Sequence, residues 1–250
     1  MNTKHFAVLA AASVFAVVGC RSAARNEGVG VGASNSPSTS KPAEPWYEGE
    51  IRAFEQTDRQ SPPEPGRVLF IGSSSIRMWK SLADDMRPTP VLNRGFGGSK
   101  TPEVLAVYDR IVTPYEPSVI VYYCGDNDLG SDNTDSQSAA DGFIAFDRRA
   151  RAQWPGIPVF YIPIKPSLAR WKNWPAMKRA NAMVREYCER TPGATYVDTV
   201  TPTLTPNGEP DPTIFMPDGL HMNAKGYAIW TRELRPLVRE AWEQRLIRDR

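Results

Sequence analysis

The sequence predicts an α/β protein, a three-layer α/β/α sandwich built on a mostly parallel sheet. Strand-like and helix-like segments alternate from residue 46 onward, and such alternation favours parallel strand pairs with helices on both faces. The run Ser118 to Cys124 (SVIVYYC) is continuous and rich in β-branched and aromatic residues. This composition is typical of a strand that is buried on both faces.

The remaining elements follow from short apolar runs and helical spacing. Strands are expected at residues 67–71, 90–93, 118–124, 157–164 and 194–197. Helices are expected at about 75–86, 101–113, 137–153, 174–190 and 223–247. Aromatic and aliphatic side chains recur near helical spacing in the last of these, which is typical of a face packed on the core. Neither an internal repeat nor a second domain is expected within residues 46–250.

The first 45 residues have the pattern of an export signal and a tether. Lys4 precedes a short apolar run, too short to span a bilayer comfortably, so residues 1–20 are interpreted as a secretory signal. Residues 17–20 (VVGC) resemble the bacterial lipobox, in which Cys20 would be lipidated; the alternative is an ordinary signal peptide with an incidental cysteine. Residues 21–45 carry Gly, Ser, Pro and Ala without an apolar period, which is typical of a flexible tether. We therefore expect a lipid-anchored protein of the bacterial envelope, and Arg21 favours the outer membrane, facing the periplasm.

Charge and metal-binding residues exclude several classes of function. The chain has 30 Lys and Arg against 28 Asp and Glu, so its charge gives no reason to expect nucleic acid as a partner. Of the two histidines, His5 lies in the expected signal, which leaves His221. A multi-histidine metal site is then impossible, and three cysteines cannot form a four-thiolate zinc site. Cys124 and Cys188 are expected to be buried free thiols rather than a disulfide. No obligate protein partner is inferred.

Four short blocks follow strand ends or lie near the last helix, and in parallel sheets sites form at the carboxyl ends of strands. Residues 72–77 (GSSSIR) place serines at a strand-to-helix turn, where a hydroxyl can be exposed beside N–H groups of the helix. Helix capping is the alternative, and the Gly-x-Ser-x-Gly elbow is absent because Ile76 replaces its second glycine. Residues 93–99 (NRGFGGS) offer glycines whose N–H groups a ligand could approach, or only a tight turn.

The other two blocks carry amide, carboxylate and imidazole groups. Residues 125–128 (GDND) contain a neutral amide donor suited to an oxyanion, or form an Asx-rich loop. In residues 218–221 (DGLH), Asp218 lies three residues before His221, so its carboxylate can reach the imidazole. A structural histidine is the alternative for this block.

In this order, the four blocks resemble those of the SGNH (GDSL-type) hydrolase family, over about residues 67–240. The resemblance implies a flavodoxin-like five-stranded parallel sheet. It also implies a triad of Ser74, Asp218 and His221, and an oxyanion hole made by the N–H groups of Ser74 and Gly98 and the side-chain amide of Asn127. One departure is Ser73, which replaces the aspartate of the family's Gly-Asp-Ser. The three consecutive serines, of which Ser74 keeps the family's register, leave the choice of nucleophile less secure.

The function that this resemblance implies is a serine esterase or acylhydrolase that needs no metal or organic cofactor. Short-acyl esters, O-acetylated glycans and lysophospholipids remain open as substrates. Phe96, Lys165, Arg170 and Trp171 are candidate substrate contacts because they follow strand ends, although solvated charges and packing aromatics are as consistent with the sequence. The competing hypothesis is a non-catalytic envelope lipoprotein that binds glycan or lipid in the same cleft.

Overall fold

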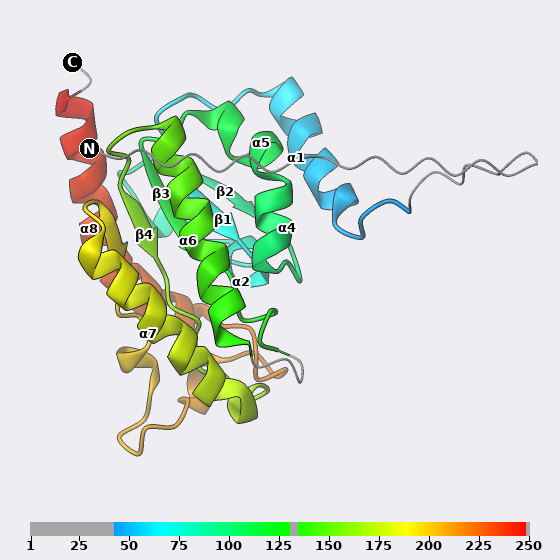
Figure 1. Ribbon diagram of the computed structural model, residues 1–250, viewed down its shortest axis with the longest axis vertical. Coiled ribbons are helices and arrows are strands. Elements are labelled where there is room, and N and C mark those ends of the chain that lie inside the picture. Colours follow the sequence, from blue (N-terminus) through cyan, green and yellow to red (C-terminus); the bar gives the residue numbers. More distant parts are fainter. Residues whose placement is uncertain (1–42, 131–134, 249–250) are drawn as a thin grey trace, which may run out of the picture. The chain divides into compact units, whose positions relative to one another are not determined.

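The computed structural model describes residues 43–130 and 135–248 (Figure 1). Its centre is a five-stranded sheet in the order β2-β1-β3-β4-β5, and every neighbouring pair is parallel. The strands are β1 (Val68–Gly72), β2 (Val91–Gly95), β3 (Val119–Tyr123), β4 (Val159–Tyr161) and β5 (Ala194–Tyr196). This is the flavodoxin-like strand order, so the predicted α/β fold with its parallel sheet is confirmed.

Helices and short helical turns connect these strands. The longer helices are α1 (Glu48–Gln60), α6 (Ser136–Gln153), α7 (Trp174–Arg190) and α8 (Ala224–Arg248). The short helices are α2 (Ser74–Arg77), α3 (Leu82–Asp85), α4 (Thr101–Ala106) and α5 (Tyr108–Ile111). Four 3₁₀ turns complete the described part: η1 (Thr113–Tyr115), η2 (Trp171–Asn173), η3 (Thr201–Thr203) and η4 (Pro212–Ile214).

Each face of the sheet is covered by its own hydrophobic core, because successive side chains of a strand point to opposite faces. On one face, Leu69, Ile71 and Tyr122 pack with residues of α1, α4, α5, α6 and α7. On the other face, Phe70 and Tyr123 pack with residues of α2, α3 and α8. Both faces are therefore buried, which explains why β1 and β3 are apolar at every position.

Three elements differ from the sequence-based expectation. The expected strand 157–164 is reduced to β4, because Pro158 and Pro163 flank it and lack the N–H that a ladder requires. The expected helix 75–86 is split into α2 and α3, and the turn between them buries Trp79 in a stacked contact with Tyr227 of α8. The expected helix 101–113 is likewise split into α4 and α5, and α1 was not predicted.

The N-terminal predictions lie outside the described residues. These are the signal at 1–20 with Cys20 and nearly all of the tether at 21–45. Among the described residues, no helix is both long enough and apolar enough to cross a membrane. Cys124 and Cys188 are both buried and free, which confirms that prediction.

Candidate active site

Ser74 lies at the turn between β1 and α2, and the local backbone explains its exposure. Gly72, the last residue of β1, has φ +141°, and a Cβ on it would lie 1.8 Å from the carbonyl oxygen of Tyr123, so only glycine fits. The Ser73 N–H donates to that same carbonyl, which fixes the start of the turn. Ser73 and Ser75 are buried, whereas Ser74 is half-buried. Of the three serines, Ser74 is the one whose side chain reaches the surface.

The structure brings Ser74, His221 and Asp218 into one line of hydrogen bonds. His221 Nδ1 lies 2.6 Å from Asp218 Oδ2, and His221 Nε2 lies 3.0 Å from Ser74 Oγ. An ionised carboxylate can only accept, so Nδ1 carries the proton of the neutral imidazole. The Ser74 hydroxyl then donates to Nε2. A histidine held in this way can take the proton of a serine that attacks a carbonyl carbon.

Asp218 is held ionised and in position by its own loop. Its Oδ1 accepts the backbone N–H groups of Leu220 and His221 at 2.9 and 3.0 Å. Partial burial acts to raise the pKa of Asp218, but the hydrogen bonds from the His221 ring and from these two N–H groups lower it to about 2. Gly219 lies in the left-handed region at φ +64°, where the loop turns back toward His221. The carboxylate is therefore fully ionised at neutral pH.

Gly98 and Asn127 reach the same end of the sheet from the loops after β2 and β3. Gly98 has φ +69° and is exposed. Within the described part of the chain, neither its N–H nor that of Ser74 donates to a protein acceptor. The Asn127 Nδ2 donates one hydrogen to the carbonyl oxygen of Ser99 at 3.0 Å, and its second N–H has no acceptor among the described residues. Three N–H groups are thus available on elements that adjoin Ser74, as an oxyanion hole requires.

The loops after β2 and β3 are also joined to each other. Thr101, at the start of α4, donates its N–H and its hydroxyl to Asp128, at 3.0 and 2.7 Å. Burial raises the pKa of Asp128, although the hydrogen bonds from Thr101 act in the opposite direction. Together with the bond from Asn127 to Ser99, this contact ties the loop that carries Asn127 to the loop that carries Gly98.

Beneath Asn127 lies a buried cluster of charges that the sequence did not reveal. Asp126 accepts hydrogen bonds from Lys165 Nζ and from the Tyr123 hydroxyl, both at 3.0 Å, and from Arg170 Nη1 at 2.7 Å. Arg170 Nη2 donates to Asn127 Oδ1 at 2.9 Å. Burial opposes ionisation of Asp126, but the charges of Lys165 and Arg170 outweigh it and hold the pKa of that carboxyl below its ordinary value.

Two of the predicted substrate contacts are therefore wrong. Lys165 is 2% exposed, and its ammonium group is held by Asp126 and the Tyr123 hydroxyl in the interior. Phe96 is fully buried and packs against Tyr47. Both residues follow a strand end, as expected, but their side chains turn toward the core.

The other two predicted contacts occupy different settings. The guanidinium of Arg170 is bound to Asp126 and Asn127, and its side chain is only 19% exposed. Trp171, in η2, is half-buried, and its ring stacks on Trp174 at a centroid distance of 6.2 Å. A substrate contact by Trp171 stays a prediction.

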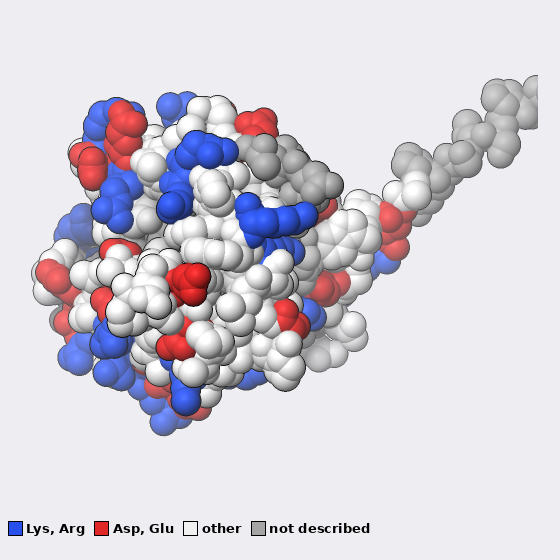
Figure 2. All heavy atoms as spheres, turned by 90° about the horizontal axis from the view of Figure 1, so that it is seen from below, with Lys and Arg blue, Asp and Glu red and all other residues white. Residues whose placement is uncertain are grey.

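Three exposed apolar side chains border the site and were not predicted. Trp46 is 59% exposed, donates its indole N–H to Glu103, and lies so close to Gly98 that a Cβ there would be 3.2 Å from its ring. Leu168 adjoins Gly219 in the loop of the triad, and the N–H of Met216 donates to the carbonyl of His221. Only the structure brings these three side chains to one site, and large apolar side chains exposed beside one site are typical of a binding surface. Figure 2, which views the molecule from below Figure 1, shows a broad area of uncharged residues that contains isolated acidic groups and is flanked by Lys and Arg side chains.

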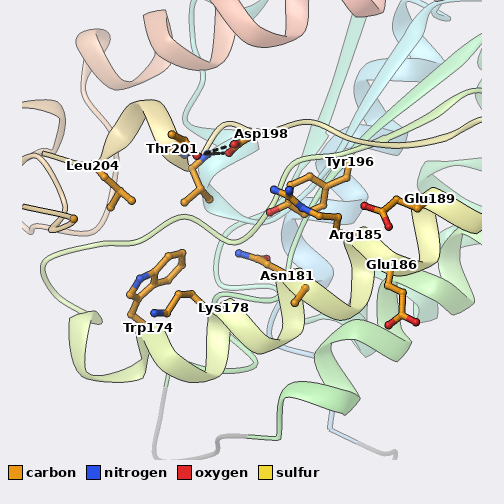
Figure 3. Close-up of a pocket in the computed structure, with 13 residues that line it drawn as sticks. Trp174, Lys178, Asn181, Arg185, Glu186, Glu189, Tyr196, Asp198, Thr201 and Leu204 are labelled. Atoms are coloured by element: carbon orange, nitrogen blue, oxygen red, sulfur yellow. Dashed lines mark hydrogen bonds between the residues drawn. The ribbon is translucent and has the colours of Figure 1, made fainter. Parts of the chain in front are cut away.

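Five cavities among the described residues lie away from Ser74. One of about 480 Å³ opens between α7 and the segment after β5, where Arg185, Tyr196 and Asp198 line it (Figure 3). In the sheet, β5 is separated from β1 by β3 and β4. None of these five cavities is lined by Ser74, Asn127 or His221.

Known structures share this fold at low sequence identity. A Bacteroides fragilis protein described as an acylhydrolase superposes with a TM-score of 0.69 at 18% identity, covering 80% of this chain and 100% of that one. A GDSL-like lipase from Bacteroides thetaiotaomicron gives 0.66 at 17% identity, covering 76% and 98%. An acetyl xylan esterase from Geobacillus stearothermophilus gives 0.53 at 18% identity, covering 71% and 95%.

At the level of sequence, no curated protein matches the chain. Residues 72–229 match the GDSL-like lipase/acylhydrolase family. The matched segment is more than half of the chain, and it begins at Gly72 and extends past His221, so it contains all four blocks. The chain therefore belongs to the GDSL-like lipase/acylhydrolase family and is a hydrolase that acts on ester bonds.

Proposed function

We propose that the protein is a serine esterase that cleaves carboxylic esters through Ser74, His221 and Asp218, with an acyl-enzyme intermediate. The observation that carries this proposal is the unbroken line of hydrogen bonds from Asp218 through His221 to the Ser74 hydroxyl. A structural histidine would not need to present its second ring nitrogen to a half-exposed serine at the start of a helix.

The reaction proceeds in two half-reactions. His221 Nε2 takes the proton of Ser74 as Oγ bonds to the ester carbonyl carbon, and the resulting imidazolium is stabilised by Asp218. Collapse of the tetrahedral intermediate breaks the bond to the alcohol oxygen, which receives the proton from His221. Water then attacks the acyl-enzyme with the same proton transfers, releasing the carboxylic acid and restoring Ser74.

Three donors serve the oxyanion of both intermediates. These are the N–H groups of Ser74 and Gly98 and the second N–H of Asn127. Donors that are already oriented before the reaction stabilise developing charge without reorganisation.

We further propose that the acyl group is short. None of the five cavities described above is lined by Ser74, Asn127 or His221, so none of them offers a long acyl chain an enclosed space beside the nucleophile. Trp46, Leu168 and Met216 offer an apolar rim to an alcohol group such as a sugar ring or an aryl ring. The acetyl xylan esterase that shares the fold acts on acetyl esters. An O-acetylated glycan fits this arrangement better than a lysophospholipid.

The test compares three neighbouring serines in one protein. Ser74→Ala should abolish both hydrolysis of p-nitrophenyl esters and covalent labelling by a fluorophosphonate. Ser73→Ala and Ser75→Ala are the matched controls and should keep both. In a chain-length series, kcat/KM should be highest for acetate and fall with longer acyl chains. A purified, folded protein that hydrolyses none of these esters would favour the non-catalytic glycan- or lipid-binding lipoprotein, and a preference for long chains would favour a lysophospholipase.

The location of the enzyme is a separate proposal that rests on the sequence of residues 17–20. Lipidation of Cys20 would attach the domain to the bacterial envelope, with the outer membrane favoured. Cys20→Ser should then release the protein from the membrane fraction into the soluble fraction. Unchanged membrane retention of this variant would contradict the anchor.

A further inference from the structure

The side-chain amide of Asn127 is held at both of its ends. Its oxygen accepts a hydrogen bond from Arg170 Nη2 at 2.9 Å, and its nitrogen donates to the Ser99 carbonyl at 3.0 Å. A flipped amide would place its NH₂ group against the guanidinium and its oxygen against the Ser99 carbonyl, so both contacts would become repulsive. Only one orientation is therefore compatible with these neighbours, and it leaves one N–H of Asn127 free to point into the site.

Arg170 is itself fixed by the buried cluster. Its Nη1 donates to the side chain and to the backbone carbonyl of Asp126, both at 2.7 Å. Asp126 is 4% exposed and is held from its other oxygen by Lys165 and the Tyr123 hydroxyl. A Cβ on Gly130 would lie 2.7 Å from the guanidinium carbon, so the chain leaves room for this side chain by carrying a glycine there.

From these contacts we propose that Arg170 is a positioning residue of the oxyanion hole, which fixes and polarises the Asn127 amide; this rests on the proposed esterase function. The cluster that holds Arg170 carries two cations, Lys165 and Arg170, against the one carboxylate of Asp126. A cation on the amide oxygen strengthens the amide N–H as a donor, because hydrogen bonds in a chain polarise one another. Negative charge that develops on the substrate oxygen is stabilised through Asn127.

The alternative role for Arg170, direct binding of an anionic substrate, conflicts with its contacts. Both terminal nitrogens are engaged, and the side chain is largely covered. A substrate-binding arginine would also affect KM, whereas a residue that acts on the oxyanion hole affects kcat. The two roles therefore give different kinetic results.

The experiment measures kcat and KM for p-nitrophenyl acetate in four proteins: wild type, Arg170→Ala, Asn127→Ala and the double variant. Loss of one oxyanion donor typically lowers turnover by about 10²–10³, which is the expectation for Asn127→Ala. Arg170→Ala leaves the donor present but unfixed, so kcat should fall by roughly 10- to 100-fold with KM within about twofold of wild type. The double variant should be no slower than Asn127→Ala, because both changes act on the same donor.

Two further measurements separate positioning from a general loss of structure. Guanidinium at millimolar concentration should restore part of the activity of Arg170→Ala and none of that of the double variant. Arg170→Lys keeps the charge that balances Asp126 and is expected to fold, but a lysine cannot donate to Asp126 and Asn127 in one planar fork. Its kcat should also fall with KM unchanged.

Several results would overturn the proposal. These are wild-type kcat in Arg170→Lys, a rise in KM at unchanged kcat in either variant, or multiplicative losses in the double variant. If the wild type hydrolyses esters in a Ser74-dependent way and the Arg170 variants give any of these three results, only the proposed role of Arg170 fails. If the wild type hydrolyses no ester, the esterase function fails and the role of Arg170 with it.

Discussion

Asp126 is the single carboxylate that balances two cations in the interior, so its removal tests whether the cluster supports the fold. Asp126→Asn keeps the size and shape of the side chain but removes its charge. Lys165, whose side chain is 1% exposed, would then keep only the Tyr123 hydroxyl and a neutral amide as partners. Arg170 would lose its charged partner as well.

The expected loss of stability is large because the buried ammonium of Lys165 would be left without a charged partner. Removing one partner of a buried ion pair costs about 3–5 kcal/mol. For a domain of this size, 1 kcal/mol corresponds to roughly 2–4 °C in Tm, so Asp126→Asn should melt about 6–20 °C below wild type. The pKa of Asp126 is lowered despite its burial, chiefly by Lys165 and Arg170, so the ionised form is the stabilising one. The difference between the two proteins should therefore be complete at neutral pH and narrow as the pH falls below the ordinary value of 3.8.

The measurement is urea unfolding and thermal melting, followed by circular dichroism, with a matched exposed control. Asp84 is ion-paired with Arg87 at 2.9 Å, but the two side chains are 70% and 79% exposed. Asp84→Asn should cost at most about 1 kcal/mol, since surface pairs contribute little. If Asp126→Asn loses no more stability than Asp84→Asn, the buried cluster does not support the fold as argued.

Three further predictions concern the turn at Ser74, the triad and the rim. Gly72→Ala should strongly lower the Tm measured by thermal melting, because its Cβ would lie 1.8 Å from the Tyr123 carbonyl oxygen at a φ of +141°. A Tm equal to that of wild type would contradict the described turn. The pKa of Asp218 is lowered to about 2 by the His221 ring and neighbouring N–H groups, against the effect of burial. The ionised Asp218 therefore stabilises the folded protein above pH 3.8, and this stabilisation is lost as the pH falls toward 2. Acid titration of wild type and Asp218→Asn should thus show a steeper loss of stability in wild type, and parallel curves would refute it. Trp46→Ala should raise KM for bulky aryl or glycosyl acetates more than for ethyl acetate, and an equal change for both would argue against a contact with the alcohol group.

The positions of the strands along the chain and the four blocks could be predicted from the sequence because both are local features, whereas the flavodoxin-like sheet was implied only by the family resemblance. An apolar run such as residues 118–124 can form a strand only if both faces are covered, and the first three blocks follow such runs directly. Helix α1 was missed because its apolar face is short: of its residues, Ile51 is the buried hydrophobic one. Strand β4 was drawn too long because apolar content does not show where prolines end the ladder.

The errors at the site arose where the direction of a side chain depends on distant residues. Lys165 follows a strand end, which is equally consistent with a surface cation and a buried one. Its partner Asp126 is 39 residues away in the sequence, and no spacing links the two. Arg170 was predicted to contact the substrate, but its guanidinium binds two acceptors in another loop, Asp126 and Asn127. Hydrogen bonds and ion pairs between different loops depend on the tertiary fold, so they could not be predicted from this single sequence.

The parallel sheet explains why so many separate segments meet at Ser74. Strands in the order β2-β1-β3-β4-β5 all end at the same edge, and the order reverses around β1, where such folds form their sites. The loops after β1, β2 and β3 supply Ser74, Gly98 and Asn127, and the chain beyond β5 returns with His221. None of the four sequence blocks lies in the loop after β4. It supplies Arg170, which reaches the reaction only through Asn127, so each strand end has a part in the proposed chemistry.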